Sequence, residues 1–202
     1  MSNYTPKLYV SWNQMSVYER SKDQYIKQYL LGIKFQTNKY MEKGLELADT
    51  LNDKAKREEV ESELGNDMAM VLLLLPQYKE TEKELNVRWM NIPMFGKIDG
   101  WDEDTFTLGE VKSGKKWTQK RANEHGQLLF YASMIYALYG KIPNIKLHWA
   151  ETEEDIMGQV IFTGKVETFD VKYTLKDLLR FYTRLKKVYE GISELTLKTF
   201  NI

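Results

Sequence analysis

Three charged side chains in the middle of the sequence have the spacing of a hydrolytic site. Glu110 and Lys112 are two residues apart in a segment that reads as a strand, so their side chains share one face. Asp99 lies on the preceding predicted strand of the same hairpin. Two neighbouring carboxylates can hold a divalent cation, which lowers the pKa of a bound water and offsets charge on a phosphate. A lysine beside them can orient or deprotonate that water.

The hairpin geometry is left open by the sequence. A turn at Glu103 leaves Asp99 and Glu110 about three residues out of step, roughly 10 Å at the rise of a strand. The strands must therefore diverge or bulge, which glycine permits, and three glycines lie in this hairpin: Gly96, Gly100 and Gly109.

A plainer interpretation is that Glu110 and Lys112 are a cross-strand pair of surface charges, since Glu-x-Lys is common. Three features favour chemistry. Asp99 is flanked by glycine and isoleucine, an unusual strand composition. A basic stretch follows at once, and then a predicted helix with Gln127 and Tyr131 four apart, and so on one face.

The basic stretch has two interpretations of similar weight. It can hold a DNA backbone beside the site, or it can be a solvated loop and helix start. Trp117 within it can stack on an unpaired base, although a tryptophan there is more often simply packed. The cations concerned are Lys115, Lys116, Lys120 and Arg121.

Composition narrows the chemistry. The chain of 202 residues has no cysteine and only two histidines, so thiolate sites are excluded and a histidine zinc site is disfavoured. Any metal is then held by carboxylates, which favours Mg²⁺ or Mn²⁺. The balance of 29 basic and 29 acidic residues gives no global sign of nucleic-acid binding. No apolar run is long enough to span a bilayer, and the first residues do not resemble a signal peptide, so we expect a cytoplasmic protein.

The pattern of elements predicts one α/β domain over residues 1–202. Apolar spacing and capping signals predict a helical N-terminal region, with capping boxes at Ser11 and Ser21. Further helices are expected at 39–51, 53–64, 68–75 and 118–139, and a last one follows residue 174. Strands are expected at 81–90, 94–101, 105–111, 145–151, 159–162 and 165–171. The core order is α-β-β-β-α-β, with helices on a mixed sheet.

The motifs and their order resemble the PD-(D/E)XK nuclease superfamily, in particular its RecB-like and phage-type exonuclease branch. Ile98-Asp99 resembles the aspartate motif, and Glu110-Val111-Lys112 resembles the E-x-K motif. The segment from Gln127 to Tyr131 resembles the Q-x-x-x-Y motif. The opening segment, residues 10–19, is similar to the helix entry of that branch.

This resemblance implies a restriction-endonuclease-like mixed sheet and cleavage of DNA phosphodiesters with Mg²⁺ or Mn²⁺. It implies that Asp99 and Glu110 are metal ligands together with the Val111 carbonyl. Lys112 would serve the water, and Gln127 and Tyr131 would support the site or the phosphate. It also implies a bacterial cell or a phage-infected host.

The sequence departs from the family at one ligand. The family usually supplies it from an N-terminal helix as Gly-x-x-x-His or Gly-x-x-x-Glu, but here Gly44 is followed by Ala48 at that place. Asp49 is the nearer substitute and Glu46 the other, because one residue along a helix is about 100° of rotation and two are about 200°. A surface role for Asp49 has similar weight.

The sequence therefore predicts a deoxyribonuclease, first of all an exonuclease of DNA processing or recombination. Endonuclease action stays open, as do strand preference, polarity, and assembly as a homo-oligomer or with a recombination protein. Two alternatives remain: a non-catalytic DNA-binding or assembly module with the same fold, and a phosphohydrolase of small nucleotides.

Overall fold

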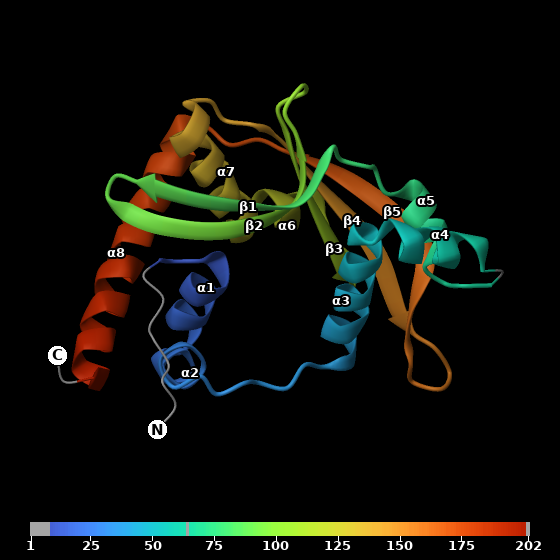
Figure 1. Cartoon of the computed structure of the whole chain (residues 1–202), viewed down its shortest axis with the longest axis horizontal. Coiled ribbons are helices and arrows are strands. Elements are labelled where there is room, and N and C mark those ends of the chain that lie inside the picture. The colour runs from blue at the N-terminus through green and yellow to red at the C-terminus, as the bar shows by residue number, and fades with distance from the viewer. Residues whose placement is uncertain (1–8, 64, 201–202) are drawn as a thin grey trace.

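A five-stranded mixed sheet forms the centre of the computed structural model, which describes residues 9–63 and 65–200 (Figure 1). The strands lie in the order of the chain, and β3 and β4 are parallel while the other neighbours are antiparallel. Their bounds are β1 Glu80–Trp89, β2 Ile92–Asp102, β3 Thr107–Gly114, β4 Asn144–Glu154 and β5 Val160–Val171. The predicted mixed sheet is confirmed.

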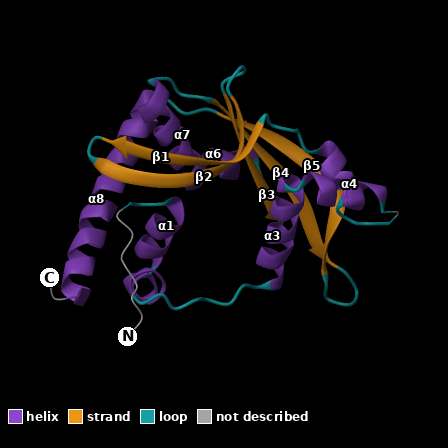
Figure 2. Cartoon of the chain, in the orientation of Figure 1, coloured by secondary structure: helices purple, strands orange, loops and turns teal. Residues whose placement is uncertain are grey.

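Helices cover the sheet in two groups (Figure 2). The helices α1, α7 and α8 gather at the β1–β2 hairpin, and α3 and α5 pack against β3 and β5. No described helix is both long and apolar enough to cross a membrane. The bounds are α1 Trp12–Arg20, α2 Lys22–Tyr25, α3 Lys39–Asn52, α4 Lys54–Ser62, α5 Ala69–Leu74, α6 Gln119–Asn123, α7 Gly126–Tyr139 and α8 Leu175–Phe200, with a short π-helix η1 at Ile26–Leu30.

Local signals set the helix starts. The side chains of Ser11 and Gln14 bond to each other's backbone amides, which confirms the capping box at α1. At α2 the hydroxyl of Ser21 accepts from the Gln24 amide, 3.2 Å away. The chain leaves η1 through Gly32, whose φ of 69° suits glycine.

Two predicted boundaries were wrong. The helix expected at 118–139 is two helices, because the chain breaks at Glu124 and His125 between α6 and α7. The strands expected at 159–162 and 165–171 are one strand, β5. Gly164, at φ 79°, stays inside it, and the register with β4 shifts between Ala150 and Thr152. Gly164, from which the sequence predicted a turn, therefore lies in a β-bulge within the strand.

The β2–β3 register also differs from the expectation. The connection is centred on residues 103–106, so Gly100 pairs with Gly109 and, two steps closer to the turn, Asp102 pairs with Thr107. Continuing this register places Asp99 opposite Glu110, without the three-residue offset. Ladder pairing stops at the two glycines, and the strands then part: β2 continues with β1, and β3 with β4. We call this point the fork.

Asp102 sets the turn that fixes this register. Its Oδ1 accepts from the amides of Asp104 at 3.0 Å and Thr105 at 3.2 Å. We expect Asp102→Ala to lower the stability of the fold by about 1 kcal/mol, because a side-chain acceptor of backbone amides is lost. Asp102→Asn retains an acceptor oxygen and is the matched control. Thermal denaturation measures both, and equal losses in the two variants would contradict this role.

Candidate active site

The fork brings Asp99 to β3. Its Oδ2 accepts a hydrogen bond of 2.8 Å from the Val111 amide. Beyond Gly100 and Gly109 the backbone of β2 no longer pairs with β3, so the side chain supplies the acceptor that the ladder would otherwise give. The carboxylate of Asp99 is thereby held beside the E-x-K segment.

Glu110 is the most enclosed charged group of this cluster. Its side chain has no exposed surface, and Oε1 accepts a bond of 2.5 Å from Nζ of Lys112. Its other oxygen, Oε2, is buried without a hydrogen-bond partner. Burial raises the pKa of Glu110 to about 8, against the opposing effect of Lys112 and with a further rise from Asp99. A buried carboxylate oxygen without a partner is costly, and this cost favours the protonated form of Glu110, in line with its raised pKa.

The two neighbours of Glu110 are perturbed as well. Burial raises the pKa of Asp99, although Lys112 and the Val111 amide act to lower it. Burial acts to lower the pKa of Lys112, but Glu110 and Asp99 outweigh it, so its pKa lies above the ordinary value. The lysine is therefore an ammonium, and its charge favours the ionised forms of the two neighbouring carboxyl groups.

The predicted pair on α7 lies beside this cluster. Nε2 of Gln127 donates to the hydroxyl of Tyr131 over 3.0 Å. Burial, and next the charge of Glu110, raise the pKa of Tyr131, which keeps its proton. A Cβ on Gly96 would come within 2.7 Å of the Tyr131 ring, so glycine lets β2 approach α7 closely.

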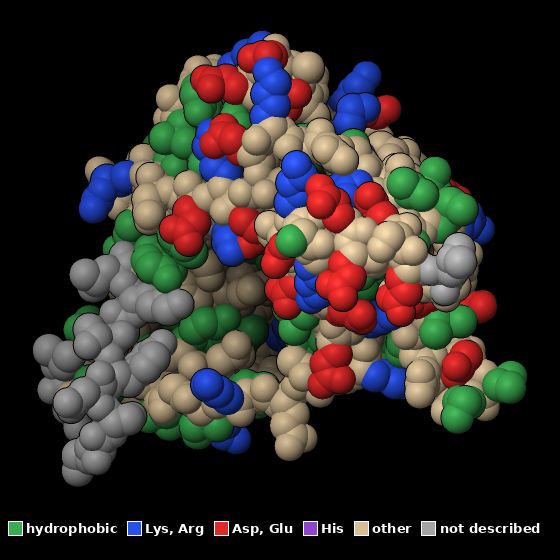
Figure 3. Space-filling model, turned by 45° about the vertical axis from the view of Figure 1, so that its right-hand side comes forward, with side chains coloured by type: hydrophobic (Ala, Val, Ile, Leu, Met, Phe, Trp, Pro, Cys, Tyr) green, Lys and Arg blue, Asp and Glu red, His purple; other side chains and the backbone are tan. Residues whose placement is uncertain are grey.

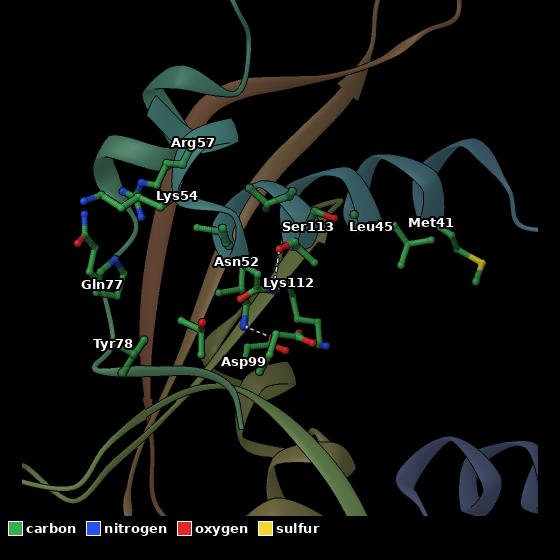
Figure 4. Close-up of a pocket in the computed structure, with 18 of the residues that line it drawn as sticks. Met41, Leu45, Asn52, Lys54, Arg57, Gln77, Tyr78, Asp99, Lys112 and Ser113 are labelled. Atoms are coloured by element: carbon green, nitrogen blue, oxygen red, sulfur yellow. Dashed lines mark hydrogen bonds between the residues drawn. The ribbon is translucent and has the colours of Figure 1, made fainter. Parts of the chain in front are cut away.

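A cleft of about 1130 Å³ opens at the fork. Its walls include Asp99, Lys112 and Gln127, together with residues of α3 and α4, whereas Glu110 does not line it. Figure 4 shows Asp99, Lys112 and Ser113 below α3. The surface in Figure 3 is hollowed near its centre, and acidic side chains gather beside the hollow.

Helix α3 does not bring a carboxylate to this cleft. It lies close to β3, since a Cβ on Gly44 would be 2.9 Å from Oγ of Ser113. Gly44 and Ala48 line the cleft, but Asp49 is exposed and does not, and Glu46 instead pairs with Lys43 at 3.2 Å. Among residues 9–63 and 65–200, no three His, Cys, Asp or Glu side chains cluster closely enough to hold a metal.

The basic stretch lies outside the main cleft. Lys115 and Lys116 line a smaller pocket of about 380 Å³ together with acidic residues of β4, and Lys120 is exposed. The guanidinium of Arg121 is 4.1 Å from the ring centroid of Trp117, which is buried. The packed interpretation of Trp117 thus describes this structure.

Two residues that line the cleft gave no signal in the sequence. Glu82 of β1 lines the cleft, has a left-handed backbone conformation with φ 52°, and forms an ion pair with Lys97. Its flanking residues pair with Gly100 and Ile98, so it lies across from Asp99. Tyr78 precedes β1, where only the fold brings it beside the fork.

Comparisons with known proteins find solved structures of similar fold, but no match to a family model or to a curated sequence. A solved structure from Eubacterium rectale, described provisionally as an exonuclease, matches with a TM-score of 0.55 at 11% identity, over 94% of this chain and 80% of that one. LHK-Exo, solved in complex with dAMP, matches with a TM-score of 0.48 at 16% identity, over 95% and 89%. At 11% identity the first match shows the fold alone, and it agrees with the predicted α/β fold with a mixed sheet.

The raised pKa of Glu110 predicts a pH-dependent stability. The folded value of about 8 lies above the ordinary 4.5, so the stability that this group contributes is complete below about 4.5 and is lost as the pH rises through 8. We expect Glu110→Gln, which stays neutral, to raise the melting midpoint of the metal-free protein more at about pH 8.5 than at about pH 5.

The exposed Glu153 of β4 supplies the control. Glu153→Gln should change the midpoint little at either pH. A Glu110→Gln variant whose midpoint differs from wild type equally at both pH values would contradict the raised pKa.

Proposed function

We propose that residues 1–202 form a single metal-dependent deoxyribonuclease domain that hydrolyses DNA phosphodiester bonds. The observation that carries this proposal is the buried, unpartnered Oε2 of Glu110, beside Lys112 and near Asp99. A group in that state is costly to the fold, and such costs are typical of functional sites. The fold, which this chain shares with a solved structure described as an exonuclease, supports the proposal.

The donor set fits a hard divalent cation in part. Glu110 and Asp99 supply carboxylate oxygens, and the Val111 carbonyl is the third ligand that the family resemblance suggests. Mg²⁺ binds through one or two carboxylates and keeps several waters, so the lack of a further carboxylate on α3 suits Mg²⁺ or Mn²⁺ with water and phosphate oxygens. When bound, such an ion supplies Lewis acidity and a more acidic water.

The chain's own residues then divide the remaining work. The ammonium of Lys112, which in this structure donates to Oε1 of Glu110, could donate to the attacking water or to a phosphate oxygen. Asp99 keeps its bond to the Val111 amide, which fixes the direction of its carboxylate. Gln127 holds the hydroxyl of Tyr131 in place beside Glu110.

DNA is the proposed substrate, and the cytoplasm of a bacterial or phage-infected cell the proposed compartment. Exonuclease action in DNA processing or recombination is our first choice. Exposed cations that follow β3 would hold the DNA backbone outside the cleft. These are Lys115, Lys116, Lys120 and Arg121.

Cleavage of end-labelled linear and circular DNA, with Mg²⁺, Mn²⁺ and chelator, tests the proposal. We expect Lys112→Ala and Glu110→Gln each to lower the cleavage rate by about 10²-fold or more, because each removes a group that serves the reacting atoms. Gln127→Ala should lower it less. Lys146→Ala, on the neighbouring strand and away from the cleft, is the control and should cleave at the wild-type rate.

A second prediction concerns α3. Because Asp49 is exposed and Glu46 is paired with Lys43, neither reaches the cleft, and we expect Asp49→Asn and Glu46→Gln to leave the Mg²⁺ requirement unchanged. A Mg²⁺ titration of the cleavage rate measures this. A higher requirement in the Asp49 variant alone would restore the ligand that the sequence predicted, and one in the Glu46 variant alone would move it there.

The absence of a cleft-lining carboxylate on α3 also favours a second candidate, a DNA-binding module that retains the fold without catalysis. The two candidates differ in the same cleavage experiment. Binding of labelled DNA without any Mg²⁺- or Mn²⁺-dependent cleavage by the wild-type protein would place the non-catalytic function ahead.

A further inference from the structure

We propose that Tyr78 is a positioning residue that braces the fork and so holds Asp99 and Glu110 in register. The effect of Tyr78 on catalysis rests on the proposed function. Its effect on the structure of the fork rests on contacts that involve neither Asp99 nor Glu110.

The β2–β3 ladder ends at the fork on a pair of glycines, which weaken a strand. Gly100 and Gly109 face each other in the last pair of the ladder, and neither has a side chain to pack across the strands. Tyr78 fills that space: a Cβ on either glycine would overlap its ring. An aromatic ring laid over cross-strand glycines replaces the missing packing.

The ring is anchored at its far end. The hydroxyl of Tyr78 and Nε2 of His148 are 2.6 Å apart, and Nδ1 of His148 is 2.8 Å from the hydroxyl of Thr168. His148 is only 2% exposed, and burial lowers its pKa to about 4, so the imidazole is neutral near pH 7. A neutral imidazole has one donor and one acceptor, which suits a bond at each nitrogen.

This chain of contacts crosses four strands. The ring covers β2 and β3, His148 lies on β4, and Thr168 lies on β5. His148 is also the register partner of Val111, whose amide donates to Asp99. The Tyr78 ring is thus tied to the same strand position that presents the E-x-K segment. Tyr78 lies on the cleft wall, as Figure 4 shows.

Amide hydrogen exchange at Val111 in the metal-free protein, followed by NMR, tests the brace directly. We expect Tyr78→Leu to speed this exchange about tenfold or more, because the fork opens more often. Tyr78→Phe keeps the ring but loses the anchor, and should speed it by a smaller factor, about threefold. If the leucine variant does not fold, the phenylalanine variant carries the test.

Tyr182 provides a matched control at the other end of β1. Its ring packs on Trp89 at a centroid distance of 5.1 Å, and its hydroxyl donates to the Met90 carbonyl over 3.4 Å. Tyr182→Leu should leave the exchange of the Val111 amide at the wild-type rate. Wild-type exchange in both Tyr78 variants, or equal acceleration in Tyr182→Leu, would overturn the brace.

Catalysis gives a second measurement. In the cleavage assay we expect Tyr78→Leu to need about tenfold more Mn²⁺ for half-maximal rate, and Tyr78→Phe less than that, because misplaced ligands weaken metal binding. An unchanged Mn²⁺ requirement with accelerated exchange would overturn the catalytic consequence alone. If the wild-type protein cleaves no DNA, the proposed function fails, whereas the exchange experiment still decides the brace.

Discussion

The hydrogen bond from the Val111 amide to the Asp99 carboxylate is the constraint on which this site depends. A sheet whose strands β2 and β3 separated without it would leave an amide unpaired inside the protein. Because a side chain takes the place of a backbone carbonyl, the strands part at the position where two carboxylates and a lysine meet. The glycines, the Tyr78 ring and the Asp102 turn all act on this one point.

The electrostatics of the cluster follow from its burial. Glu110 is fully enclosed, and Lys112 satisfies only one of its oxygens. Neighbouring carboxylates raise each other's pKa values and repel when both are ionised, and one ammonium offsets part of that cost. This arrangement lowers the stability of the metal-free protein, and a bound cation would raise it again. This cost is the physical basis of the proposed metal site.

Short-range patterns predicted much of this molecule, and long-range pairing accounts for what they missed. The shared face of Glu110 and Lys112, the capping box at Ser11 and the core order follow from local periodicity. The sequence predicted a turn at Glu103, but the register follows from a turn centred on residues 103–106 that Asp102 caps. Ala48 at the cleft and Tyr78 over the glycines depend on how α3 and the segment before β1 dock, which is tertiary information.

A thermal melt with chelator and with Mn²⁺, on wild type and Asp99→Asn, tests the central claim most directly. Asparagine can still accept from the Val111 amide, so the fork should persist in the variant. The account predicts that Mn²⁺ stabilises wild type by about 2.7 kcal/mol at a hundredfold excess over its Kd, and that the metal-free variant is at least as stable as wild type but responds little to Mn²⁺. A wild-type midpoint indifferent to Mn²⁺, or a variant that responds fully, would contradict it.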